Sequence, residues 1–518
     1  MTIHSEAPRL DVEAFLRSHE YKSLLRFITC GSVDDGKSTL IGRLLYETKA
    51  VHEDQLSAVE VDSFRHGGAG RPLDLALLVD GLAAEREQGI TIDVAYRYFT
   101  THRRKFIIAD TPGHAQYTRN MATGASTADL AILLVDARKG ATVQTRRHAL
   151  IASLIGIRQI VVAVNKMDLV DWGEEAFRRV EAQIRAFGLA LDFESVSFIP
   201  LSALTGDNVA RPARSCPWYS GPTLLAALED AEPCARQGAF RMPVQWVNRP
   251  NADFRGYSGL VTSGEVAVGD AVLVQPAGRE TRVARILGTA GEQKRAVAGQ
   301  SVTLVAEDAV DIARGDLLAS PSEPARTARA IDATLLWMHE RPLRQGDSHL
   351  VKIGTRTVTA TVTAIRSRVD LASFEEVSAE RLELNEIGEA ELALDQPVAF
   401  DLYRDDRSTG GFILIDRESF DTAGMGLARD ARAEHARPHP IVKLARRWFA
   451  SANETSLRSL FKAVTWRLWG SIDTTVLAFL FTGNLRLSAA IGGTEIMTKI
   501  ALYYAHERLW TRIGFGKG

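Results

Sequence analysis

A short loop bounded by glycines carries the first residues whose types and spacing could do chemistry. It has the pattern G-x-x-x-x-G-K-S and stands between an apolar segment at 27–30 and a helix expected to open at Ser38 or Thr39. The glycines allow consecutive backbone N–H groups to point inward at phosphate oxygens, Lys37 can reach the β- and γ-phosphates, and the Ser38 hydroxyl can ligate Mg²⁺. The pattern therefore predicts a cradle for nucleotide phosphates. Its residues are Gly31, Ser32, Val33, Asp34, Asp35, Gly36, Lys37, Ser38 and Thr39.

A second motif, N-K-x-D, leaves an apolar segment at 160–164 and indicates which base is bound. The carboxylate of Asp168 can accept hydrogen bonds from both N1–H and N2–H₂ of guanine. Adenine offers no such pair of donors, so a carboxylate facing it would stay unpaired, which is costly in a buried site. The motif therefore predicts a GTP site, in which Asn165 braces the loop, the stem of Lys166 covers the base and the N–H of Ala203 reaches guanine O6. The base-binding residues expected from the sequence are Asn165, Lys166, Asp168, Ser202, Ala203 and Leu204.

Two further segments are expected to respond to the γ-phosphate and to be released when it is lost. The sequence D-T-P-G-H at 110–114 follows an apolar segment, which places Asp110 to hold Mg²⁺ through water and the N–H of Gly113 to sense the γ-phosphate. The sequence G-I-T-I at 89–92 supplies Thr91 as a second protein ligand to Mg²⁺. His114 is the candidate for orienting the attacking water, although a histidine after a glycine turn is more often a plain polar loop residue. We expect catalytic roles for Lys37, Thr91 and His114, and Mg²⁺ ligation by Ser38, Thr91 and Asp110.

The composition is that of a multidomain protein without a strong global charge. The 518 residues include 62 lysines and arginines against 64 aspartates and glutamates, for a formal net charge of −2. No global basic field indicates a nucleic-acid partner, and none is expected. The cysteines, Cys30, Cys216 and Cys234, show no paired spacing, which fits a reducing compartment better than a disulfide framework or a zinc site. Residues 1–13 lack an apolar run, so no secretory signal is expected.

The pattern of residues changes along the chain. Apolar spacing between 12 and 25 suggests an amphipathic helix that packs on the first domain, and an α/β pattern continues to about 235. Short valine-rich stretches with Gly-Asp turns then predict a small closed β-barrel, and a second barrel is expected to include strands at 351–365 and 389–401. The expected domains are an N-terminal helical extension at 1–24, a P-loop GTPase domain at 25–235, β-barrels at 236–329 and 330–440, a basic linker at 441–455 and a helical hairpin at 456–518.

The motifs of the first domain, D-T-P-G-H and G-I-T-I among them, resemble those of the translational GTPase class typified by elongation factor Tu. Within that class, Ser32 and Asp35 stand where translation factors usually carry histidines. Three further segments also distinguish this chain from translation factors. They are L-D-L-A-L-L-V-D-G-L at 73–82, D-F-R-G-Y at 253–257 and T-G-G-F-I-L-I-D at 409–416. Over roughly residues 10–430 the chain resembles the large GTPase subunit of bacterial heterodimeric ATP sulfurylase. The resemblance implies an α/β P-loop GTPase domain followed by two β-barrel domains.

The resemblance also implies a reaction and a partner. In that family ATP and sulfate form adenylyl sulfate and pyrophosphate, an unfavourable adenylyl transfer that GTP hydrolysis makes favourable. The sequence has no second P-loop, no S-G-G-x-D-S loop and no H-x-G-H signature, so the adenylyl site is expected on a separate small catalytic subunit, which would bind the ATP and sulfate. GTP and Mg²⁺ are the expected cofactors of this chain. The alternatives are a translation-factor-like GTPase and a membrane-tethered switch GTPase without coupled catalysis.

The carboxyl end carries two apolar stretches, 464–481 and 487–504, joined by a short polar turn. Each is about long enough to cross a bilayer, which takes ~17–25 residues. Charged residues interrupt both stretches. Inserting one charged residue at the middle of a bilayer costs roughly 2.5–3.5 kcal/mol. Periodicity alone therefore does not decide between a membrane hairpin and a soluble amphipathic hairpin. The interrupting residues are Arg467, Asp473, Glu495 and Lys499. Aromatic and basic residues near the outer ends, and a resemblance to a small family of predicted membrane modules, favour a cytoplasmic protein attached through 456–518 to the inner face of the cytoplasmic membrane.

Overall fold

The structure is a computed structural model that describes residues 22–51, 53–54, 56–57, 75–79, 91–233, 238–251 and 254–431. Most of the amphipathic helix expected between 12 and 25 lies outside these residues, but its last apolar residues, Leu24 and Leu25, belong to a β-strand, so the expected helix is wrong there. The basic linker and the hairpin expected from 441 onward also lie outside the described residues. Among the residues that are described, no helix is long and apolar enough to cross a membrane.

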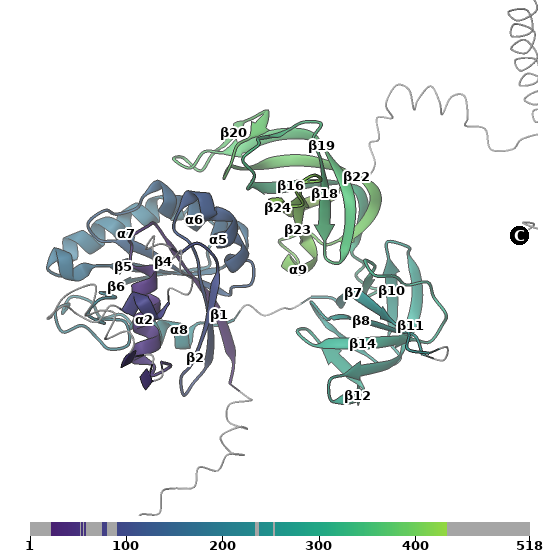
Figure 1. The fold of residues 1–518 in the computed structure, drawn as a ribbon, viewed down its shortest axis with the longest axis horizontal. Helices are drawn as coiled ribbons and strands as arrows, with labels where there is room; N and C mark the ends of the chain where they lie inside the picture. The colour runs from purple at the N-terminus through teal and green to yellow at the C-terminus, as the bar shows by residue number, and fades with distance from the viewer. Residues whose placement is uncertain are drawn as a thin grey trace, which may run out of the picture. The chain divides into compact units, whose positions relative to one another are not determined.

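A six-stranded sheet forms the centre of the first domain in the described part of the chain (Figure 1). Its strands follow the order β2-β3-β1-β4-β5-β6, and neighbouring strands are parallel except that β2 runs antiparallel to β3 at the edge. The strands are β1 (Leu24–Gly31), β2 (Ala95–Thr100), β3 (Lys105–Asp110), β4 (Leu130–Asp136), β5 (Gln159–Asn165) and β6 (Ser195–Pro200).

Two apolar clusters cover the two faces of this sheet. Successive residues of β4 point to opposite faces, so Ile132 and Leu134 pack in the cluster that contains α2, whereas Leu133 and Val135 pack in the cluster that contains α6. Because both faces are buried, the central strands β4 and β5 read as nearly continuous apolar runs without alternation. The helical segments are α2 (Lys37–Glu47), α5 (Thr118–Ala125), α6 (Val143–Leu154), α7 (Glu174–Gly188), α8 (Leu224–Asp230), η1 (Leu75–Leu78), η2 (Ala115–Tyr117) and η3 (Met167–Val170).

The parallel strands bring their carboxyl ends to one edge of the sheet. The register pairs Thr29 with Asp110 and Asp136 with Asn165, so the ends of β1, β3, β4 and β5 lie side by side. The loop after β1 leads into α2, which begins one residue before the expected start, directly after Gly36 at a left-handed φ of 92°. Segments predicted to bind a nucleotide therefore emerge together, although 130 residues separate the ends of the Asn165 to Asp35 hydrogen bond.

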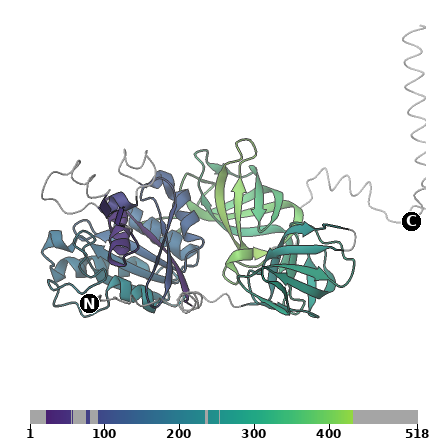
Figure 2. The ribbon, with the colours of Figure 1, turned by 60° about the horizontal axis from the view of Figure 1, so that its bottom comes forward.

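Closed β-barrels follow this domain, which confirms the predicted fold class for the described residues (Figure 2). The first barrel closes in the order β10-β15-β7-β8-β14-β11, because β11 pairs with β14 on one side and β10 on the other. Closure removes the unpaired edges that an open sheet would expose. Its strands are β7 (Arg241–Asn248), β8 (Gly256–Leu260), β9 (Glu265–Ala267), β10 (Ala271–Gln275), β11 (Arg279–Gly288), β12 (Gly291–Gln293), β13 (Arg295–Val297), β14 (Ser301–Ala306) and β15 (Leu317–Ala319).

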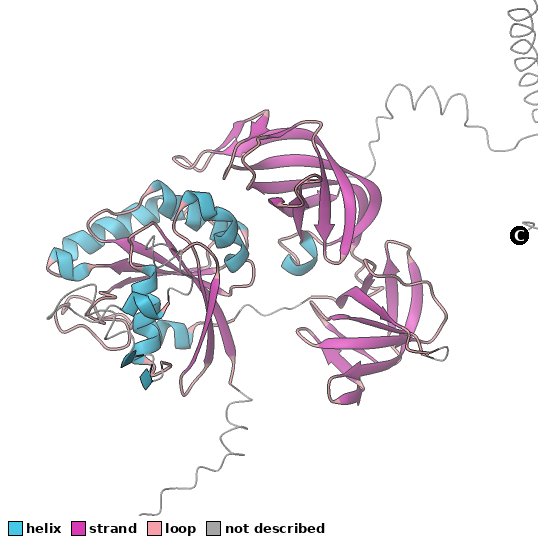
Figure 3. Ribbon diagram, viewed as in Figure 1, coloured by secondary structure: helices cyan, strands magenta, loops and turns pink. Residues whose placement is uncertain are grey.

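The second barrel closes in the order β18-β23-β24-β16-β22-β19, with β19 pairing back to β18. The single strand predicted at 351–365 is wrong, because Gly354 turns the chain at a φ of 53° and splits the segment into a β18–β19 hairpin. Figure 3 shows both barrels as strands, with one short helix in the second. Its elements are β16 (Arg326–Trp337), β17 (Leu343–Arg344), β18 (Ser348–Ile353), β19 (Arg356–Val369), β20 (Glu376–Ser378), β21 (Arg381–Leu382), β22 (Ile387–Phe400), α9 (Arg407–Gly410), β23 (Gly411–Ile415) and β24 (Thr422–Ala431).

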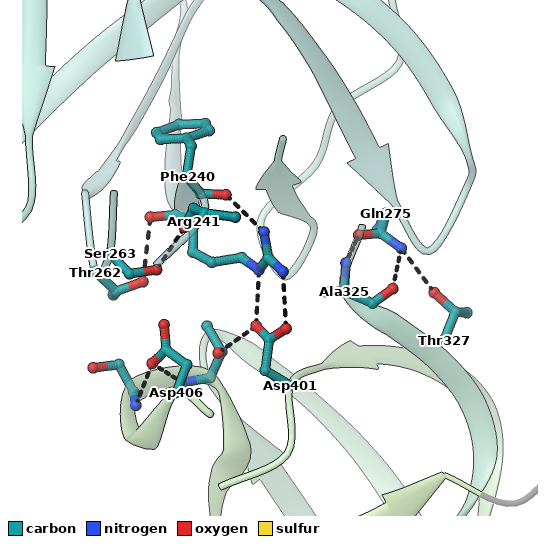
Figure 4. A network of polar contacts seen from close by, with 12 residues as sticks. Phe240, Arg241, Thr262, Ser263, Gln275, Ala325, Thr327, Asp401 and Asp406 are labelled. Atoms are coloured by element: carbon teal, nitrogen blue, oxygen red, sulfur yellow. Dashed lines mark hydrogen bonds and ion pairs between the residues drawn. The ribbon is translucent and has the colours of Figure 1, made fainter. Parts of the chain in front are cut away.

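A buried ion pair joins the two barrels (Figure 4). Arg241 of β7 donates through Nε and Nη2 to the two carboxylate oxygens of Asp401, at 2.8 and 2.9 Å. Arg241 Nη1 donates to the carbonyl of Phe240 at 3.0 Å, and the Thr409 hydroxyl donates to Asp401 at 2.7 Å. The side chains of Arg241 and Asp401 are only 7% and 14% exposed. Such burial is tolerated because the hydrogen-bonding groups of both ions have partners.

Removing one member of this pair should destabilise the barrels far more than breaking an exposed pair. We expect Asp401→Ala to lower the free energy of unfolding by about 3–5 kcal/mol, because the Arg241 guanidinium stays buried without its anion. Glu292→Ala is the matched control: it breaks a similar two-bond pair with Arg285, at 2.9 and 3.1 Å, whose side chains are half-exposed. That loss should have little effect on the free energy of unfolding, because solvent screens an exposed ion pair. Urea denaturation followed by tryptophan fluorescence measures both, and equal costs would contradict the stabilising role of the inter-barrel pair.

Candidate functional site

A cavity of about 160 Å³ lies where the predicted phosphate loop meets the segments predicted to respond to the γ-phosphate. Its lining residues are Val33, Asp34, Gly36, Lys37, Ser38, Thr39, Ala76, Thr91, Gly113 and His114. Of these lining residues only Ala76, in η1, was not predicted to be a site residue. It could have been found because it lies in the distinctive segment 73–82. A larger cavity, of about 250 Å³, contains Tyr98 and Ala128 but none of the predicted site residues. The smaller cavity is therefore the candidate site.

Close backbone contacts require glycine at both ends of the loop. Gly31 has a φ of 144° and Gly36 a φ of 92°, where other residues are strained. A Cβ atom on Gly31 would lie 2.5 Å from the carbonyl oxygen of Leu134, and one on Gly36 would lie 2.5 Å from Nδ2 of Asn165. The loop can therefore lie against the ends of β4 and β5 only because these two positions carry no side chain.

Lys37 is held between the loop and the D-T-P-G-H turn. Its Nζ donates to the carbonyl oxygen of Ser32 at 2.8 Å and to that of Gly31 at 3.3 Å, and the residue is 7% exposed. A Cβ atom on Gly113 would lie 2.5 Å from the same nitrogen, so the turn passes directly over the ammonium group. Burial lowers the pKa of Lys37, and nearby carboxylates, Asp110 first among them, oppose that shift.

Two buried side chains hold the first turn of the loop. The N–H of Gly31 donates to Nδ1 of His148 at 3.0 Å, and the N–H of Ser32 donates to Oδ2 of Asp35 at 2.7 Å. Burial is the main cause that lowers the pKa of His148 to about 3, so the imidazole is neutral and its Nδ1 can accept a hydrogen bond. Sequence reasoning missed His148. Its only signal was a position on the buried face of α6, which apolar residues share.

Asn165 connects the loop to the segment after β6. Its Nδ2 donates to the carbonyl oxygen of Asp35 at 2.7 Å, and its Oδ1 accepts from the N–H of Ala203 at 2.9 Å. The next residue, Lys166, donates through Nζ to the carbonyl oxygen of Asp34. The N-K-x-D segment is therefore bonded directly to the phosphate loop and to the S-A-L segment, which brings the two predicted halves of the site together.

A buried carboxylate at the end of β4 also holds Lys166. Asp136 is fully buried, and its Oδ2 lies 2.7 Å from Nη2 of Arg138 and 3.2 Å from Nζ of Lys166. Burial raises the pKa of Asp136, but the hydrogen bonds from Arg138 and Lys166 outweigh burial and hold the pKa well below its usual range. The carboxylate therefore stays ionised and keeps Lys166 beside the predicted base site. Sequence reasoning missed Asp136, whose only signal was that it ends an apolar strand.

The predicted base-reading residues differ in how their side chains are used. Asp168 lies in the first turn of η3, is half-buried, and makes no hydrogen bond to another described residue through its carboxylate. Ser202 is fully buried, and its hydroxyl accepts from the N–H of Thr205 at 3.3 Å within its own loop. Leu204 is 44% exposed. Asp168 is therefore the member of this set whose polar group is open to a ligand.

The predicted Mg²⁺ ligands come from three separate segments. Ser38 and Thr91 line the cavity, and Asp110 lies buried at the end of β3, with its Oδ1 3.4 Å from the hydroxyl of Thr29. Asn120 of α5 donates to the carbonyl oxygen of Ile92 at 2.7 Å, which holds the segment that carries Thr91. No cluster of three or more His, Cys, Asp or Glu side chains suited to a metal occurs among the described residues. Two hydroxyls with one carboxylate beside a phosphate cradle suit a hard cation that also binds the ligand's oxygens.

His114 lines the cavity next to a contact with the second barrel. Asn385 donates through Nδ2 to the carbonyl oxygen of Ala115, the residue after His114, at 2.8 Å. Arg119 of α5 reaches the carbonyl oxygen of Met338, at 3.4 Å. A change of shape at the D-T-P-G-H turn that moves Ala115 would therefore alter a hydrogen bond to the second barrel.

Three family models match separate parts of the chain. Residues 22–234 match the elongation factor Tu GTP binding domain, and residues 330–429 match the GTP-eEF1A C-terminal domain-like family. Residues 460–511 match a family described as a predicted membrane protein (DUF2061).

Individual relatives share a single name. Sulfate adenylyltransferase subunit 1 of Methylorubrum populi is 54% identical over 431 residues, which cover 83% of this chain and 92% of the relative. The protein of the same name from Salmonella typhimurium is 54% identical over 430 residues, covering 82% and 90%. A crystal structure of sup35 complexed with GDP aligns at 25% identity, 82% and 98% coverage, and a TM-score of 0.37. The chain belongs to the sulfate adenylyltransferase subunit 1 family, and its first domain is a GTP-binding domain of the elongation factor Tu kind.

Proposed function

We propose that this chain is the GTP-hydrolysing subunit of a sulfate adenylyltransferase, in which GTP hydrolysis drives the formation of adenylyl sulfate and pyrophosphate from ATP and sulfate. The observation that carries the proposal is the meeting of Lys37, Ser38, Thr91 and His114 around one cavity, in a chain of this family. Family membership favours this function over a translation factor or an uncoupled switch. The adenylyl transfer itself belongs to a small catalytic subunit, since this sequence has no motif for it.

The phosphates of GTP would lie in the loop at 31–38, with Lys37 as the cation that meets them. Lys37 is positioned for this role because the carbonyl oxygens of Ser32 and Gly31 hold its Nζ at the loop. Ser38, Thr91 and Asp110 would hold Mg²⁺, which when bound neutralises charge on the β- and γ-phosphates. The missing Cβ atoms at Gly36 and Gly113 support this reading, because a side chain at either position would run into Asn165 or Lys37.

Guanine would be read by Asp168, whose carboxylate accepts no hydrogen bond from another described residue. Lys166 lies beside it, held by the ionised Asp136. Asn165 supports the same site indirectly, because its amide joins the phosphate loop to Ala203. His114 would orient the attacking water next to Gly113, and the bond between Ala115 and Asn385 offers a direct route from that water to the second barrel.

We also propose that the segment 456–518 attaches the protein to the inner face of the cytoplasmic membrane. The support is the match of residues 460–511 to a predicted membrane protein family, together with the two apolar stretches of the sequence. The charged residues Arg467, Asp473, Glu495 and Lys499 would then have to face one another, because unpaired charges facing lipid are costly. The GTP site would stay in the cytoplasm.

Changing the base-reading carboxylate should change the base. Asp168→Asn replaces a double acceptor by an amide that suits the carbonyl of xanthine better than the amine of guanine. We expect GTP affinity to fall roughly tenfold to a hundredfold, the ~1.5–3 kcal/mol of a hydrogen bond to a charged group, and XTP affinity to rise. Equilibrium binding of both nucleotides measures this. Asp171→Asn, an exposed change three residues away, is the matched control, and equal GTP affinity in the Asp168 and Asp171 variants would remove Asp168 from base recognition.

Coupling is the direct test of the proposed function. With its small catalytic subunit, the chain should form more adenylyl sulfate from ATP and sulfate when GTP is present, and Lys37→Ala should abolish that gain because the phosphates lose their cation. Lys294→Ala, at an exposed position of the first barrel, should leave the gain intact. Adenylyl sulfate, released phosphate and pyrophosphate can be followed in one assay. If the complex forms the same amount of adenylyl sulfate with and without GTP, the proposed coupling is refuted.

Fractionation of cells tests the membrane proposal. The full-length chain should stay in the membrane fraction through a carbonate wash, because inserted helices are not released by pH or salt. A chain truncated after Arg447 is the control and should be soluble with unchanged GTP binding. Full-length chain that is soluble without detergent would rule out insertion and leave docking of the hairpin on a protein.

A further inference from the structure

One anionic side chain is buried inside the loop that is proposed to bind a highly charged anion. Asp35 is 1% exposed, and its Oδ2 accepts the N–H of Ser32 at 2.7 Å. A Cβ atom on Gly31 would lie 3.3 Å from the same oxygen, so the carboxylate lies against the first turn of the loop. A buried carboxylate is costly unless cations or hydrogen bonds compensate it.

The compensation of Asp35 is incomplete. Lys37 and Lys139 attract the carboxylate, and Asp136 repels it. Among the described residues, no lysine, arginine or histidine lies within ion-pair distance of Asp35. The ammonium of Lys37 is turned instead toward the carbonyl oxygens of Ser32 and Gly31. His148 also holds this turn but is neutral. Burial accordingly raises the pKa of Asp35 more than its hydrogen bond and the two lysines lower it.

We propose that Asp35 sets the affinity of the loop for nucleotide: its charge repels the phosphates and keeps GDP release fast, so that exchange needs no second protein. The inference rests on the proposed GTP site and adds to it the control of nucleotide exchange. Asp34 and Gly36, the neighbours of Asp35 in the chain, line the phosphate cavity. A charge this near to it, in a partly buried site, is strong enough to change a dissociation constant by about tenfold or more. Because the repulsion acts on the bound state, it appears mainly as a faster dissociation rate.

The same side chain has an opposite effect, because its hydrogen bond to Ser32 organises the loop. Asp35→Asn separates the two effects: the amide oxygen can still accept the N–H of Ser32, but the negative charge is gone. Asp35→Ser is a second neutral variant, with a hydroxyl that can also accept this N–H. Glu175→Gln removes one negative charge from an exposed position on α7 and is the control for a general change in charge.

The test is the release of a fluorescent GDP analogue from the full-length chain, chased with unlabelled GDP in a stopped-flow instrument. Wild type and Glu175→Gln should release the analogue within seconds and at closely similar rates. Asp35→Asn and Asp35→Ser should release it about tenfold more slowly or slower still, where tenfold corresponds to ~1.4 kcal/mol. Circular dichroism melting curves establish that each variant is folded.

Two results would count against the inference, and a third would count against the proposed GTP site on which it rests. Release from a folded neutral variant at the wild-type rate, or faster, would show that the carboxylate serves only the structure of the loop. Release from wild type over many minutes would show that exchange needs a second protein. A wild-type chain that binds no GDP would instead refute the proposed GTP site, which keeps the two failures distinct.

Discussion

The shared carboxyl edge of β1, β3, β4 and β5 is the constraint on which the rest of the first domain depends. Parallel strands point the same way, so each strand delivers the segment that follows it to this one edge. Gly31 and Gly36 then allow the phosphate loop to lie directly on the ends of β4 and β5, where a Cβ atom would meet Leu134 or Asn165 at 2.5 Å. Without that approach, Asn165 could not bond to the loop backbone.

Buried charges in this protein are treated in two different ways. Asp136 has two cationic partners, and Asp401 has a two-bond partner in Arg241 and a hydroxyl donor. In both cases the partners offset the loss of hydration that each carboxylate undergoes on burial. Asp35 has one backbone N–H and no ion pair with a described residue. The Asp35 carboxylate is therefore compensated less completely than those of Asp136 and Asp401, which is the basis of the role proposed for it in nucleotide exchange.

The second barrel contacts the first domain through side chains as well as backbone. Phe374 stacks on Phe187 of α7, with ring centroids 5.4 Å apart, and the Tyr403 hydroxyl donates to the carbonyl oxygen of Ile155 at 2.8 Å. Asn385 adds the bond to Ala115 beside His114. Packed elements joined in this way shift between discrete arrangements and do not deform continuously. A rearrangement near His114 would thus reach the second barrel as a change in packing.

The sequence by itself determined the family and the fold class of the described residues, a GTPase domain followed by two β-barrels, and comparison and structure confirm both. It could do so because glycine-bounded loops and apolar periodicity are local signals. The roles of the individual site residues stay predictions, although Lys37, Ser38, Thr91, Gly113 and His114 do line one cavity. Local patterns failed at the β18–β19 hairpin, where one glycine turned a run of apolar alternation into two strands.

Only the tertiary structure decided which distant side chains support the loop. The sequence predicted that Asn165 braces the loop, but its partner Asp35, 130 residues away, and the hydrogen bond between Gly31 and His148, across 117 residues, could not be predicted from the local sequence. The same holds for Asp136, whose ionised state depends on Arg138 and Lys166 outweighing the effect of burial. Which partner meets a polar group depends on the packing of the whole sheet. Spacing along the chain can therefore predict the loop that binds a ligand, but not the buried groups that hold the loop in place.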